Sequence, residues 1–83
     1  MELTEQQVNV IKHTVGLDKN PSQPKGFFRN RFSANEKHFE YPILKSLTGL
    51  GLMEHSKPDE MFNGNMMFYL TKEGIKLAKT YSK

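Results

Sequence analysis

The sequence predicts one small α+β domain, with three main helices and an antiparallel sheet of two to three strands. Apolar residues recur every three or four positions in three stretches, residues 4–16, 35–50 and 71–83, and this spacing is typical of amphipathic helices. Between the second and third stretches, two apolar runs flank Asn63-Gly64, the strongest short hairpin signal. At 83 residues, the chain is expected to form a single domain, residues 1–83.

The composition argues against several classes of function. There is no Cys, so disulfides, thiolate metal ligands and cysteine nucleophiles are absent. The three His residues lack metal-binding spacing, and no phosphate-binding glycine loop or nucleophile elbow occurs, so we expect no metal, no cofactor and no small-molecule substrate. The chain is therefore not expected to be an enzyme. A polar N-terminus and the lack of a long apolar run predict a cytoplasmic protein without a membrane span.

The positive charge is concentrated in two parts of the chain. Residues 17–34 and 66–83 each hold four Lys or Arg residues against one acidic residue, so each carries +3. The other segments, residues 1–16, 35–55 and 56–65, each carry −1, and the whole chain carries +3. This mildly basic balance permits nucleic-acid binding without requiring it.

The first helix has clear signals at both ends. Thr4 is a favoured N-cap, and Gln7 three residues later completes a capping box. Gly16 tolerates the left-handed conformation that often ends a helix. The apolar face between them consists of Val8, Ile11 and Val15.

A loop and a short aromatic segment follow the first helix. Residues 17–26 include two Pro and one Gly among mostly polar residues, which predicts a loop. In residues 27–32, Phe28 and Phe32 share one face whether the segment is a strand or a helix. Gly26 and Asn30 favour the extended reading.

The second helix is expected within residues 35–50, but its start is ambiguous. Pro42 is tolerated only in a first helical turn. Either the helix begins about a turn before Pro42, or a short turn precedes it and a break falls near Tyr41. The expected core face is Phe39, Ile43, Leu44, Leu47 and Leu50.

The last part of the chain predicts a hairpin and a third helix. Residues 52–56 and 66–70 are the expected strands, and residues 57–65 connect them. Thr71 is the expected cap of the last helix. In the second strand, Met66, Phe68 and Leu70 are expected to line one face.

Two stretches resemble the winged-helix family. Residues 44–54 (LKSLTGLGLME) look like the end of a recognition helix running into the wing. Residues 69–77 (YLTKEGIKL) resemble the second wing strand and following helix of many winged-helix regulators. Residues 29–32 (RNRF), followed by residues 51–53 (GLM), also resemble small uncharacterised proteins of phages and prophages. The chain departs from the family in lacking a clear helix before the recognition helix.

The resemblance implies a small DNA-binding protein, such as a phage-type transcriptional regulator whose partner is double-stranded DNA. The residues expected to approach the groove or hold phosphates are Lys25, Arg29, Arg31, Lys37, Tyr41, Lys45 and Thr48. The other interpretation of this helix face is an ordinary solvated surface, because Glu36 and Glu40 would repel phosphates. Aromatic and basic residues mixed in residues 25–32 permit base stacking, although the sequence favours core packing for two of the three Phe residues, with the Arg pair facing water.

The alternative is a protein-interaction module of the same fold, acting in phage assembly or on a host protein. The expected wing, residues 57–65, carries −1 rather than the usual positive charge. Met61 and Phe62 near its tip are apolar, which favours a protein partner unless they fold back onto the hairpin.

Overall fold

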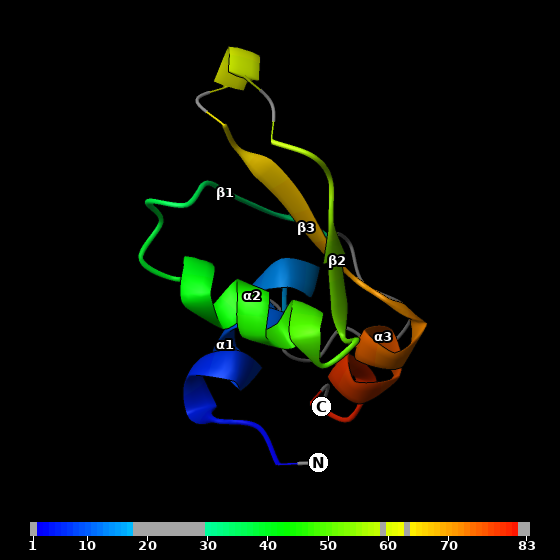
Figure 1. The fold of residues 1–83 in the computed structure, drawn as a ribbon. Helices are drawn as coiled ribbons and strands as arrows, with labels where there is room; N and C mark the ends of the chain where they lie inside the picture. Colours follow the sequence, from blue (N-terminus) through cyan, green and yellow to red (C-terminus); the bar gives the residue numbers. More distant parts are fainter. Residues whose placement is uncertain (1, 18–29, 59, 63, 82–83) are drawn as a thin grey trace.

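Helices and strands alternate along most of the chain (Figure 1). The computed structural model describes residues 2–17, 30–58, 60–62 and 64–81. These residues confirm the predicted class, a small α+β domain with three helices and a three-stranded antiparallel sheet. In order, the elements are α1 (Glu5–Val15), β1 (Phe32–Ala34), α2 (Tyr41–Gly49), β2 (Met53–His55), the short 3-10 helix η1 (Glu60–Phe62), β3 (Met66–Leu70) and α3 (Lys72–Lys79).

Helix α1 begins and ends where its sequence signals predict. The Gln7 N–H donates to the Thr4 hydroxyl over 3.1 Å, and the Thr4 N–H donates to the Gln7 side-chain oxygen over 2.9 Å. Gly16 caps the other end with a φ of 89°, in the left-handed region. Thr14 is fully buried, and its hydroxyl is satisfied by the Val10 carbonyl at 2.7 Å.

The sheet has the strand order β1-β3-β2, so the last strand in sequence lies at its centre. Phe68 of β3 lies opposite Phe32 of β1 and also opposite His55 of β2. The predicted inner face of β3 is confirmed, because Met66, Phe68 and Leu70 are all buried. The extended reading of residues 27–32 is confirmed at Phe32, and residues 27–29 lie outside the described residues.

Helix α2 begins at Tyr41, which puts Pro42 in the first turn and settles the ambiguity in favour of a break near Tyr41. Residues 36–40 form turns instead of helix. The prediction that Phe39 and Leu50 belong to the core face is therefore wrong. Phe39 precedes the helix and is 84% exposed, and Leu50 follows it and is 44% exposed. Within residues 30–40, no helix precedes α2.

The predicted hairpin joins β2 to β3 through a long arm. The pairing ends where the Ser56 N–H donates to the Met67 carbonyl over 3.0 Å. Beyond that bond the arm extends past the sheet and carries η1 at its tip (Figure 1). Gly64 has a φ of 75°, as its place in a turn predicts, and Asn63 lies outside the described residues.

Helix α3 is held tightly against the start of β2. The Thr71 hydroxyl accepts from the Gly74 N–H over 3.2 Å, which confirms the predicted cap. The Thr71 N–H donates to the Leu52 carbonyl over 3.0 Å. Gly74 packs so closely on this carbonyl that a Cβ atom at position 74 would overlap the Leu52 oxygen.

The three α-helices and the three strands all contribute to one hydrophobic core. Ile11 of α1, Leu44 of α2, Phe68 of β3 and Ala78 of α3 are all fully buried in the same cluster. The inner face of the sheet and the three helices thus share one core, and the opposite face presents Met67 and Tyr69, which are 39% and 37% exposed.

Candidate nucleic-acid interface

The face of α2 expected to read DNA lies partly against the sheet. Tyr41, Lys45 and Thr48 are spaced by four and three residues, so they share one side of the helix. The Tyr41 ring is half-buried and meets Phe68 of β3 edge-on, with 6.2 Å between ring centroids. Tyr41 is therefore largely a packing residue.

Thr48 and Lys45 are also engaged within the domain. The half-buried Thr48 hydroxyl donates to the Leu44 carbonyl over 2.9 Å. The exposed Lys45 ammonium lies 3.3 Å from Nε2 of His55 on β2. Nδ1 of His55 lies 2.8 Å from the Ser56 carbonyl oxygen, which can only accept, so Nδ1 carries the proton and Nε2 accepts from Lys45.

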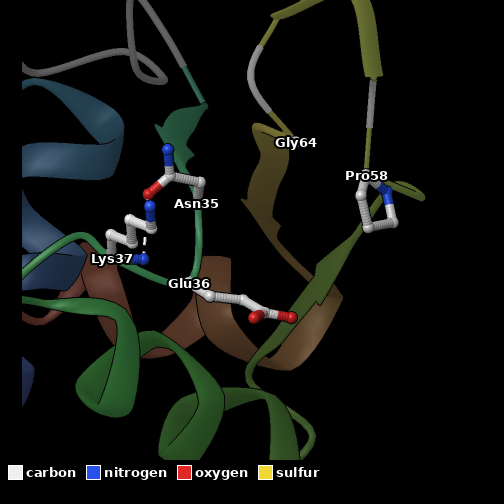
Figure 2. Close-up of a pocket in the computed structure, with 5 residues that line it drawn as sticks. All are labelled: Asn35, Glu36, Lys37, Pro58 and Gly64. Carbon is white, nitrogen blue, oxygen red and sulfur yellow. Dashed lines mark hydrogen bonds between the residues drawn. The ribbon is translucent and has the colours of Figure 1, made fainter.

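An open hollow of about 540 Å³ separates the turn before α2 from the hairpin arm. Figure 2 shows Asn35, Glu36 and Lys37 on one side and Pro58 and Gly64 on the other. The Lys37 N–H donates to Asn35 Oδ1 over 2.9 Å, and the Glu36 carboxylate extends toward the hairpin arm (Figure 2). Glu36 and Lys37 therefore give this hollow charges of both signs.

A second hollow, of about 460 Å³, lies at the edge of the sheet along β1. The exposed Arg31 lies just before this strand, and its backbone N–H donates to the Thr14 carbonyl over 3.0 Å. The hollow is lined by His13, Arg31, Phe32, Ser33, His38, Glu40 and Met67. It brings a predicted phosphate-binding cation together with aromatic side chains.

The aromatic side chains at this edge touch one another in a row. His13 meets Phe32 edge-on at 5.1 Å between ring centroids, and Phe32 meets His38 edge-on at 5.4 Å. His38 in turn stacks on Phe39 at 4.9 Å, with 16° between the ring planes. Sequence reasoning missed this row because its members come from α1, β1 and the turn before α2.

The hairpin arm presents apolar surface and little positive charge. Met61 in η1 is 89% exposed. Lys57 and Glu60 are both exposed on the arm and offset each other. The remaining site residues predicted from the sequence, Lys25, Arg29 and the side chain of Phe62, lie outside the described residues.

The predicted site residues therefore do not form one basic stripe over α2 and the hairpin. Residues 35–55 and 56–65 each carry −1, and residues 17–34, which lead into β1, carry +3. Of the predicted cations, Arg31 lies at the β1 hollow and Lys37 lies in the turn that follows β1. Of the predicted cations that the structure describes, Arg31 and Lys37 thus lie at or just after β1, and Lys45 lies on α2.

Within the described ranges, no group of three His, Asp or Glu residues is arranged to hold a metal ion. None of the helices in these ranges is long and apolar enough to cross a membrane. No protein-family model, curated protein or solved structure matches the chain. Its function is therefore inferred from the geometry and charge described above.

Proposed function

We propose that this chain is a non-enzymatic, cytoplasmic nucleic-acid-binding domain of the winged-helix type. The observation that carries this proposal is the placement of Arg31, an exposed residue that lines a hollow beside β1. Phosphate neutralisation supplies most of the affinity of nucleic-acid-binding proteins, so the position of the cations indicates the contact surface. That surface is the β1 side of the domain.

The arrangement of elements supports this proposal. Along the chain, α2 is followed by the hairpin of β2 and β3, and then by α3. The resemblance implies this order for a recognition helix, its wing and the helix after the wing. Lys37 is exposed in the turn between β1 and α2, so it is the cation closest in sequence to Arg31 that can contact the same nucleic acid. Lys45 is exposed on α2 but lies against His55 of β2, the edge strand opposite to β1. A small nucleic-acid-binding regulator is the function that this geometry supports best.

The hairpin arm has a smaller part in the proposed contact than the wing of the family pattern. Its described charges offset each other, and the Met61 side chain is 89% exposed. An arm without net positive charge adds little binding affinity through phosphate contacts. We therefore place the phosphate contacts at Arg31 and Lys37.

The test is the salt dependence of binding to a mixed-sequence DNA duplex, followed by fluorescence polarisation. Arg31→Gln and Lys37→Gln should each weaken binding and reduce the slope of log affinity against log salt by about 1, because each removes one phosphate contact. Lys79→Gln, at an exposed position near the end of α3, is the matched control and should leave the slope unchanged. Equal effects of all three substitutions, or no binding at low salt, would contradict the proposal.

A protein-binding role through the hairpin is the second candidate, and the 89% exposure of Met61 favours it. In this role the partner is a protein, such as a phage assembly component or a host factor. The two candidates differ in a direct way. Nucleic-acid binding predicts amide shifts around Arg31 on addition of DNA, and protein binding through the arm predicts no such shifts even at low salt.

A further inference from the structure

Phe39 is a large aromatic side chain that is exposed to solvent. It is 84% exposed, yet the turn that carries it is well fixed by backbone hydrogen bonds. The His38 N–H donates to the Asn35 carbonyl, and the Tyr41 N–H donates to the His38 carbonyl, each over 3.0 Å. An exposed aromatic ring at a fixed position indicates a binding surface, because burying the ring against a ligand is energetically favourable.

The ring of Phe39 rests on a support that reaches the core. It stacks on His38, whose ring meets the buried Phe32 edge-on. The Glu40 N–H donates to Nδ1 of His38 over 3.0 Å and so fixes the orientation of the imidazole. Because Phe39 is already oriented, a second flat ring stacking on it loses less conformational freedom than at a mobile side chain.

A cation lies in the hollow that His38 lines. This hollow, about 460 Å³, falls within the size range of small-ligand sites and also contains Arg31 and Ser33. The planar guanidinium of Arg31 matches the geometry of a phosphate. Glu40 lines the same hollow and disfavours a phosphate near itself, so the anion is expected at the Arg31 end.

A flat aromatic ring beside an anion is the chemistry of a nucleotide. Bases inside a duplex are covered on both faces by their neighbours, so only an unpaired base can stack on a side chain. We propose that Phe39 and Arg31 form a subsite for an unpaired nucleobase and its adjoining phosphate. This inference rests on the proposed nucleic-acid binding, and it adds that the domain prefers a single strand to a blunt duplex.

The experiment compares two labelled probes by fluorescence polarisation, a mixed-sequence DNA strand of about 12 nucleotides and the blunt duplex of the same sequence. Wild-type protein should bind the strand more tightly. Phe39→Ala should weaken strand binding roughly tenfold, in line with the loss of one stacked base, and leave duplex binding unchanged. Phe39→Trp should retain strand binding, because the indole provides an equally flat surface.

Met61→Ala is the matched control, because Met61 is similarly exposed but lies on the hairpin arm. It should change neither affinity, and circular dichroism should show that both alanine variants fold. A direct readout is the upfield shift of the Phe39 ring protons in NMR spectra when the strand is added.

The outcomes separate this inference from the proposed function. If Phe39→Ala leaves strand binding unchanged, or weakens strand and duplex equally, the subsite is wrong. Duplex binding that still depends on Arg31 and on salt would then leave the proposed function intact. If neither probe binds at low salt, both the subsite and the proposed function are wrong.

Discussion

At the scale of single residues, the Asn30 side chain makes the hydrogen bonds to β3 that the backbone of a neighbouring strand would otherwise make. Its Oδ1 accepts from the Leu70 N–H over 2.8 Å, and its Nδ2 donates to the Leu70 carbonyl over 3.3 Å. One side chain thus satisfies both backbone groups of the last residue of β3, across 40 positions of sequence. It also anchors the entry to β1, next to Arg31.

Replacing this amide should measurably destabilise the domain. Asn30→Ala leaves the N–H and C=O of Leu70 without their partner in a partly buried place, so we expect a loss of about 1 to 3 kcal/mol in the free energy of unfolding. Urea denaturation followed by circular dichroism measures it. Asn9→Ala, at an exposed position of α1, is the control and should be neutral or slightly stabilising. Equal effects of the two substitutions would show that the Asn30 bonds contribute nothing.

The sequence could not predict contacts that depend on the tertiary fold. Asn30 could be interpreted only as a residue that weakens a helix, because its partner lies in another strand. The same is true of Lys45, whose partner His55 becomes visible only when α2 lies beside β2. Arg31 and Lys37 could be proposed as site residues from charge alone, and both are exposed.

At the scale of elements, the helix ends that have local signals were predictable. Thr4 with Gln7 and Thr71 each cap the helix that follows, and such a cap needs only residues within one turn. The start of α2 was not, because Pro42 fits the first turn under either reading. Phe39 lies four positions before Ile43 and so fits a helical spacing, although the helix begins after it.

The contact between α3 and β2 should be sensitive to a single methyl group. Gly74→Ala places a Cβ against the backbone oxygen of Leu52, so α3 must move, and we expect a loss of about 1 to 3 kcal/mol in stability. Gly49→Ala is the matched control at the end of α2, where a Cβ meets nothing within 4 Å. It should be neutral or stabilise by up to about 1 kcal/mol.

Thermal denaturation of both glycine variants provides the comparison. A melting temperature that falls for Gly74→Ala and holds or rises for Gly49→Ala would support the close approach of α3 to β2. A Gly74→Ala variant as stable as the wild type would show that the helix can shift without cost.

At the scale of the whole molecule, one core joins the three α-helices and the three strands, so these elements should unfold together. The three Tyr residues sample different parts of the fold, since Tyr41 lies in α2, Tyr69 in β3 and Tyr81 just beyond α3. We expect tyrosine fluorescence and far-ultraviolet circular dichroism to give coincident urea transitions. Separate midpoints would mean that part of the domain unfolds independently.

The central position of β3 also affects when the chain can fold during its synthesis. The strands β1 and β2 do not pair with each other. Both pair with β3, which the ribosome makes last of the three. Until Leu70 has emerged, Phe32 and Met53 have no sheet on which to pack, although both are buried in the finished domain. The nascent chain must therefore carry both outer strands without their partner, and the sheet forms only once β3 has been made.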